Sequence, residues 1–278
     1  MTTYVISTAI ADVRALPDPT SELVTQALMN TSAKLGENSG EWTFITLSDY
    51  EGWVRNDELD EPIVKGFCKV GDCCGTPLHL VAVISTTRTP LYSDSKSDNV
   101  FGYAYLSTML PLLDITEASR VQVALPGERS AWLARVTVEI SRQKTAFPRS
   151  SVAAITRYAR GFLGVPYLWG GTSFEGIDCS GFTQLCYHMG GYVIPRDAHQ
   201  QHAFLRQSVD RNHLQEGDLI FFGRREITHV ALALNNQEYI HSEGQLYNCV
   251  TSNSFDPSND HYDERLDEIY WGAKRVIE

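Results

Sequence analysis

The sequence has no long apolar stretch and nowhere approaches the roughly 18 consecutive apolar residues from which a transmembrane helix is built. Its N-terminus, from Met1 to Thr8, has neither a basic region nor an apolar core, so we expect no signal peptide. These two absences predict a chain that does not span a membrane and that works in the cytoplasm.

Positive charge is also scarce. The chain has 23 lysines and arginines against 34 acidic residues, which gives a formal net charge of -11. Such a chain repels the phosphates of nucleic acids, so we expect no DNA or RNA partner. The same balance disfavours tight docking on an anionic polymer such as a bacterial wall, and it favours a small soluble substrate.

Cysteine is too rare for a disulfide scaffold in a chain of 278 residues, and we expect the thiols to be reduced. The spacing of Cys68, Cys73 and Cys74 matches no zinc pattern and no histidine pair follows, so small apolar residues around a turn are the simpler interpretation. We therefore predict neither a metal nor another cofactor. The remaining cysteines are Cys179, Cys186 and Cys249.

Residues 1–146 contain short β-like runs separated by turn residues, which is typical of small barrels. Runs of this kind are Val5-Ile6, Thr43–Leu47, Gly52-Trp53-Val54, Leu80–Ile84, Thr89–Tyr92 and Ala131–Val138. In the last run and beyond it, Val136, Val138 and Ile140 alternate with polar residues, as in a half-buried strand.

The order of strand-like runs and tryptophans in residues 1–146 also repeats loosely. Trp42 and the run Gly52-Trp53-Val54 end one unit near residue 60, and a second unit from about Pro77 to Ile140 has Trp132 similarly late. We predict domains at residues 1–62 and 63–146. The order of motifs in the first unit resembles a bacterial SH3 domain, so the resemblance implies a pair of SH3-like barrels.

The spacing of apolar residues changes near residue 147, where a helical periodicity replaces the pattern of short strands. A first helix is predicted over residues 151–163, and a second opens at Asp178-Cys179-Ser180 and ends at Gly190-Gly191. Strands are predicted at residues 218–222, 229–234 and 238–242. Helices that lead into an antiparallel sheet predict an α+β domain over residues 147–278.

Cys179 opens the second helix, where free N–H groups and the positive dipole end stabilise a thiolate. His229 and His241 lie on the next two strands, and if those strands are antiparallel neighbours, both rings reach one helix tip. One imidazole would then be the base and the other would orient it. The alternative is a structural cysteine and two histidines without a catalytic role.

Six motifs occur in this order along the chain: Tyr167–Gly171, Asp178–Phe182, Pro195-Arg196-Asp197, Gly217–Phe222, Thr228–Ala231 and Tyr239–Ser242. Together they resemble the NlpC family of bacterial cell-wall cysteine peptidases. The resemblance implies a papain-like fold with Cys179 as nucleophile, His229 as base and His241 as the residue that orients it. It places Tyr167 on the oxyanion side, with the backbone N–H of Cys179.

The SH3-like half narrows the resemblance to the YkfC-like γ-D-glutamyl-L-diamino acid endopeptidases. These hydrolyse muropeptides that carry a free N-terminal L-alanine, during cell-wall recycling. In this subgroup an acidic residue at the Asp197 position and a tyrosine of the first SH3 unit bind the terminal ammonium. Tyr50 is our candidate for that tyrosine.

The same resemblance implies further contacts with substrate, from Asp178, Ser180 and Arg196. Trp169 either packs beneath the site or lines it. The subgroup has a serine after the Arg-Asp pair, whereas this chain has Ala198, so we expect one hydrogen bond to substrate to be lost at that subsite.

Two other functions remain open at this point. The chain could be an inert module that binds peptide or wall through its SH3 units, although the presence of Cys179, His229 and His241 argues against it. The same fold could also perform amidase or acyl-transfer chemistry.

Overall fold

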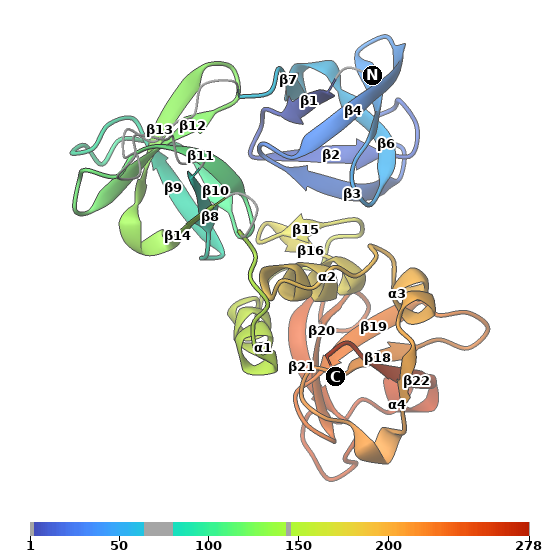
Figure 1. Cartoon of the computed structure of the whole chain (residues 1–278). Helices are drawn as coiled ribbons and strands as arrows, with labels where there is room; N and C mark the ends of the chain where they lie inside the picture. Colours follow the sequence, from blue (N-terminus) through green and yellow to red (C-terminus); the bar gives the residue numbers. More distant parts are fainter. Residues whose placement is uncertain (1–2, 64–79, 143–145, 278) are drawn as a thin grey trace. The chain divides into compact units, whose positions relative to one another are not determined.

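The computed structural model describes residues 3–63, 80–142 and 146–277 (Figure 1). The chain forms two compact units, Met1–Ala146 and Phe147–Glu278. Within the described ranges, no helix has both the length and the apolar character that crossing a membrane requires.

The first sheet of the N-terminal unit has seven strands in the order β3-β2-β6-β5-β4-β1-β7. Alternate side chains point inward and form an apolar core that includes Ile6, Val13, Ile45 and Val54. The strands are β1 (Thr3–Ile6), β2 (Ile10–Arg14), β3 (Leu23–Leu28), β4 (Ser32–Ser39), β5 (Trp42–Thr46), β6 (Glu51–Arg55) and β7 (Leu59–Asp60).

The second sheet has seven strands in the order β10-β9-β13-β12-β11-β8-β14, which is the order of the first sheet with every number raised by seven. The identical strand order of the two sheets agrees with the loose repeat in the sequence. The predicted boundary between residues 62 and 63 stays a prediction. The strands are β8 (Leu80–Ile84), β9 (Arg88–Tyr92), β10 (Val100–Tyr105), β11 (Met109–Asp114), β12 (Arg120–Leu125), β13 (Arg129–Ala134) and β14 (Val138–Arg142).

The predicted continuous strand over Ala131–Val138 is wrong. Strand β13 ends at Ala134, a 3-10 turn follows over Arg135–Thr137, and β14 starts at Val138. The hydroxyl of Thr137 donates to the carbonyl of Ala134 across this turn at 2.8 Å. Val136 is therefore 88% exposed instead of half-buried. The alternation of apolar residues continued across the turn, so periodicity could not detect the break.

Over its described residues, 147–277, the C-terminal unit has a six-stranded antiparallel sheet in the order β17-β22-β18-β19-β20-β21 and four α-helices, as the α+β prediction requires. Helix α2 packs on β19 and β20, and α1 packs on α2 (Figure 1). The helices are α1 (Val152–Gly161), α2 (Cys179–Met189), α3 (Ala198–Phe204) and α4 (Glu264–Glu268). The sheet strands are β17 (Gln207–Val209), β18 (Leu219–Phe222), β19 (His229–Ala233), β20 (Glu238–Glu243), β21 (Cys249–Ser254) and β22 (Tyr270–Arg275). A short hairpin, β15 (Thr172–Ser173) with β16 (Gly176–Ile177), precedes α2.

The ends of α2 follow from its sequence. The carboxylate of Asp178 caps the N-terminus by accepting from the N–H of Gly181 at 2.7 Å. At the other end, Gly191 has a φ of 77°, a left-handed conformation that glycine adopts without a steric penalty. The predicted start and end of this helix are confirmed. Its buried apolar face consists of Phe182, Leu185, Cys186 and Met189.

The cysteines of the described residues are free thiols, at Cys179, Cys186 and Cys249. The predictions for Cys68, Cys73 and Cys74 lie outside the described residues. In the part of the chain that the structure describes, no group of three or more histidine, cysteine or acidic side chains is arranged to hold a metal ion.

Candidate active site

Cys179 is the first residue of α2 and is buried where that helix packs on β19. The backbone N–H groups of Val230 and Ser180 lie against its sulfur and lower the pKa of the thiol, as does the nearby Arg196 guanidinium. Val230 directly follows His229, so the sulfur lies beside the start of the strand that carries the predicted base.

Burial dominates the ionisation of this thiol. Burial, together with the smaller effect of the Asp178 carboxylate, raises the pKa of Cys179 to about 12. From the sequence we expected the N-terminus of α2 to be free to stabilise a thiolate. The structure corrects this expectation, because Asp178 already occupies that N-terminus and its charge opposes a second anion. The resting thiol is therefore protonated, and a base must take its proton during the reaction.

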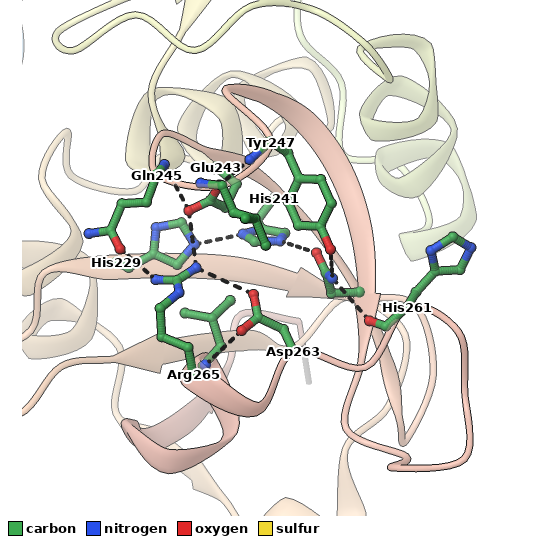
Figure 2. Close-up of polar contacts among 11 residues, drawn as sticks. His229, His241, Glu243, Gln245, Tyr247, His261, Asp263 and Arg265 are labelled. Atoms are coloured by element: carbon green, nitrogen blue, oxygen red, sulfur yellow. Dashed lines mark hydrogen bonds and ion pairs between the residues drawn. The ribbon is translucent and has the colours of Figure 1, made fainter.

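His229 and His241 lie on neighbouring antiparallel strands, as the sequence required. Nε2 of His229 is 2.7 Å from Nδ1 of His241, and Nε2 of His241 is 2.9 Å from Oδ1 of Asn253 on β21 (Figure 2). The three side chains thus form a hydrogen-bonded row across β19, β20 and β21. His241 is fully buried within it, and His229 is half-buried at the end next to the Cys179 helix.

Both histidines are neutral at neutral pH. Burial lowers the pKa of His229 well below 6.5, with further lowering by His241 and by the Arg265 guanidinium. Burial also lowers the pKa of His241, against the opposing effects of Asn253, Glu243 and Asp263. A neutral imidazole beside a protonated thiol can act as a general base.

Asp178, Ser180 and Arg196, all predicted to contact substrate, form one buried network. The guanidinium of Arg196 makes a two-pronged ion pair with Asp178, at 2.7 and 3.0 Å, and donates to the hydroxyl of Ser180 at 3.0 Å. Arg196 is only 1% exposed. A side chain this deeply buried acts on the site by holding Asp178 and Ser180, and is not a surface that a ligand reaches directly.

The loop before α2 depends on glycine. A Cβ atom at Gly171 would lie 2.4 Å from the carbonyl oxygen of Gly176, and one at Gly181 would lie 2.6 Å from the carbonyl oxygen of Gly171. The N–H of Gly170 also donates to Asp178 at 2.9 Å. Close backbone approach at these positions brings the loop against the start of the Cys179 helix.

Tyr167 is half-buried, and its ring lies against Gly244, where an added Cβ would come within 2.7 Å of a ring carbon. Burial and the nearby Cys179 raise the pKa of its hydroxyl, which therefore remains a hydrogen-bond donor. Trp169 is 60% exposed and so does not pack beneath the site.

Asp197 and Tyr50 were predicted to bind the substrate ammonium. Asp197 is half-exposed at the N-cap of α3, directly after Arg196. Ala198, which replaces the subgroup's serine, is buried at the start of that helix. Tyr50 is half-exposed in the N-terminal unit, before β6, and its carbonyl accepts from the N–H of Leu47 at 2.8 Å.

Sequence reasoning missed the residues behind the histidine row. Glu243 is buried, accepts from the N–H groups of the next loop, and pairs with Arg265 at 3.0 Å (Figure 2). Arg265 also pairs with Asp263 at 3.3 Å. Asn253 follows His241 by 12 residues, and His241 follows His229 by the same interval. That repeated spacing was a signal for Asn253, but it went unrecognised because no strand was predicted over β21.

Comparison with known proteins gives two matches to family models. Residues 164–271 match the NlpC/P60 family, and residues 13–59 match the bacterial dipeptidyl-peptidase SH3 domain. The predicted SH3-like resemblance of the first unit is thus confirmed over the matched residues. For the second unit it stays a prediction.

Named relatives cover most of the chain. A γ-D-glutamyl-L-lysine dipeptidyl-peptidase of Bacillus cereus is 31% identical over 80% of this chain and 68% of its own length. Dipeptidyl-peptidase 6 of Lysinibacillus sphaericus is 28% identical over 94% of this chain and 95% of its own length. A solved NlpC/P60 family protein from Bacillus cereus has the same fold over 100% of both chains, with a TM-score of 0.83 and 24% identity. The chain therefore belongs to the NlpC/P60 family of cysteine peptidases.

Proposed function

We propose that this peptidase hydrolyses the γ-D-glutamyl-L-diamino acid bond of peptidoglycan stem peptides that carry a free N-terminal L-alanine. The observation that carries the proposal is the buried thiol of Cys179 against the backbone N–H of Val230, the residue that follows His229, together with the contact of 2.7 Å between His229 and His241. The names of the Bacillus cereus and Lysinibacillus sphaericus relatives support a dipeptide-releasing activity on such peptides.

In the proposed reaction, His229 accepts the thiol proton as the sulfur of Cys179 attacks the γ-carbonyl carbon of D-glutamate. The imidazolium that forms is stabilised through its hydrogen bond to His241. This sequence needs no resting thiolate, which agrees with the raised pKa of the buried thiol.

The tetrahedral intermediate carries a negative oxygen. At the first position of α2, the backbone N–H of Cys179 has no acceptor within the helix, and Tyr167 keeps its hydroxyl proton. We assign these two groups to the oxyanion. His229 then protonates the departing amine, a thioester remains on Cys179, and water hydrolyses it to release L-Ala-D-Glu.

Selectivity for a free amine is assigned to Asp197 and Tyr50. A carboxylate holding an ammonium in a partly dry site gains a charge-assisted hydrogen bond of roughly 1.5–3 kcal/mol. Acetylation of the L-alanine removes that charge and leaves the carboxylate unpaired. Intact peptidoglycan, in which this nitrogen is acylated, is then a poor substrate, and the activity fits cytoplasmic recycling of released muropeptides.

The test is direct. Incubation with L-Ala-γ-D-Glu-diaminopimelate should release L-Ala-D-Glu, detected by mass spectrometry, and the N-acetylated peptide should react about 10²-fold more slowly in kcat/KM. The Asp197→Asn variant should lose that discrimination while keeping its kcat on the acetylated peptide. Equal kcat/KM values for the two peptides in the wild-type enzyme would contradict the free-amine requirement and favour general wall hydrolysis.

A further inference from the structure

The hydrogen-bonded row does not end at His241. Oδ1 of Asn253 contacts Nε2 of His241 at 2.9 Å, while the amide nitrogen Nδ2 donates to the carbonyl of His261 at 2.9 Å and to the hydroxyl of Tyr247 at 3.3 Å (Figure 2). Asn253 is 1% exposed. A buried side-chain amide with partners at both ends has one favourable orientation, in which its oxygen faces a donor and its nitrogen faces acceptors.

The carbonyl of His261 determines which end of the amide is which. A backbone carbonyl can only accept hydrogen bonds, so the Asn253 atom that faces it must be the NH₂ group. The other end, the oxygen, therefore faces His241. An amide oxygen only accepts, so Nε2 of His241 must carry a hydrogen.

The position of the hydrogen on His241 then determines the tautomer of His229. With its hydrogen on Nε2, neutral His241 has a bare Nδ1, which accepts from Nε2 of His229 across 2.7 Å. Neutral His229 consequently has a bare Nδ1, and this is the nitrogen that can take the proton of Cys179. The reversed arrangement would place the lone pairs of His241 Nε2 and Asn253 Oδ1 against each other and would leave His229 already protonated at Nδ1.

We propose that Asn253 is a positioning residue that sets the tautomers of both histidines and so keeps His229 ready to act as the base. The inference rests on the proposed function of Cys179 and His229. Asn253 touches no reacting atom and acts through His241.

The surroundings hold Asn253 in this orientation. The carbonyl of His261 also accepts from the N–H of Ser254, the next residue along β21, at 2.9 Å. Tyr247 lies in a loop whose N–H groups donate to the carboxylate of Glu243, and Arg265 pairs with that carboxylate. Both acceptors of the Asn253 amide are thus anchored by contacts of their own.

Nuclear magnetic resonance of the full chain with ¹⁵N-labelled histidine tests the proposal without any substrate. The resonances of the two rings are assigned by their loss in the His229→Gln and His241→Gln variants. We expect both rings of the wild-type protein to carry hydrogen on Nε2 and a bare Nδ1. Hydrogen on Nδ1 of either ring in the neutral state would overturn the proposal.

Two variants of Asn253 sharpen the test. In Asn253→Leu, which lacks an acceptor, the Nδ1–H form of His241 should appear and kcat should fall about 10²-fold with little change in KM. In Asn253→Asp, one carboxylate oxygen still accepts from Nε2 of His241, so the wild-type tautomers should persist, although the second oxygen loses the hydrogen bond to the carbonyl of His261 and the variant should be less stable. Asn212→Leu, at an exposed position between β17 and β18, is the matched control and should change neither measurement.

Each outcome is decisive. A folded Asn253→Leu variant with wild-type tautomers would refute the role of Asn253. If Asn253→Leu does not fold, the tautomers of the two histidines in the wild-type protein and in Asn253→Asp test the proposal. Hydrogen on Nδ1 of either ring in either protein would overturn it. Wild-type protein with the expected tautomers but no hydrolysis of the stem peptide would contradict the proposed function, and it would support the tautomer assignment.

Discussion

The two units of this chain differ in how deeply their most buried ion pairs lie. In the N-terminal unit, the strands of each sheet enclose a core of apolar side chains. Ion pairs such as Arg55–Glu41 have both partners at the surface. In the C-terminal unit, Arg196 pairs with Asp178 inside the domain, and the buried carboxylate of Glu243 pairs with Arg265. The first arrangement needs only apolar alternation, whereas the second needs particular partners at particular positions.

The difference has a physical reason. A buried charge without its partner is strongly unfavourable, so each member of a buried network constrains the next. Such a network holds a thiol and two imidazoles in one geometry, which an apolar core alone does not do. The C-terminal unit therefore combines rigidity with chemistry, and the predictions below test that contrast.

The largest expected effect is the loss of activity on removing the thiol. Cys179→Ser should lower kcat by at least about 10³-fold because a serine hydroxyl is far harder to deprotonate. Cys249→Ser, at a half-buried thiol on β21, is the matched control and should retain activity. Turnover of the serine variant at the wild-type rate would rule out the cysteine mechanism.

The second-largest expected effect is a loss of stability on breaking the buried ion pair between Arg196 and Asp178. Arg196→Met leaves the carboxylate of Asp178 buried without its partner, so unfolding in urea should show a loss of about 3–5 kcal/mol. Arg55→Gln, which removes the surface ion pairs of Arg55 with Glu41 and Asp57 in the N-terminal unit, should leave the urea midpoint unchanged within error. Equal effects of the two substitutions would remove the contrast between the units.

The pH profile should show an acid limb below the ordinary histidine range. Protonation of His229 removes the base, and burial lowers its pKa well below 6.5, so kcat/KM should stay high through pH 6.5 and fall about tenfold per unit at lower pH. The apparent value belongs to the Cys179–His229 pair, which His241, Glu243 and Arg265 surround. A midpoint above 6.5 would contradict a buried neutral base.

The smallest expected change concerns the N-terminal unit. If Tyr50 holds the substrate ammonium, Tyr50→Phe should raise KM for the free-amine peptide about 2- to 10-fold with kcat retained, as the loss of one hydrogen bond implies. The acetylated peptide is the control, because its KM should not respond. A variant with unchanged KM for both peptides would remove Tyr50 from the specificity site.

The sequence predicted the parts of the site that depend on local pattern. The capped start of α2 at Asp178-Cys179 and the neighbouring strands of His229 and His241 followed from spacing and from the family resemblance. The buried location of Arg196 did not, because an arginine in a motif looks the same whether it points into solvent or into a domain. The break at Val136 was hidden by an alternation that continued through a turn.

Glu243 has a consequence for hydrogen exchange. Its carboxylate accepts from the amides of Gln245, Leu246 and Tyr247, at 2.6–2.9 Å, in a loop where Leu246 is 68% exposed. These amides should exchange with deuterium as slowly as those of a strand, although the loop has the outward appearance of a freely exchanging segment. Hydrogen bonds from these amides lower the pKa of Glu243, so their protection should persist under mildly acidic conditions and disappear only when that carboxylate takes up a proton.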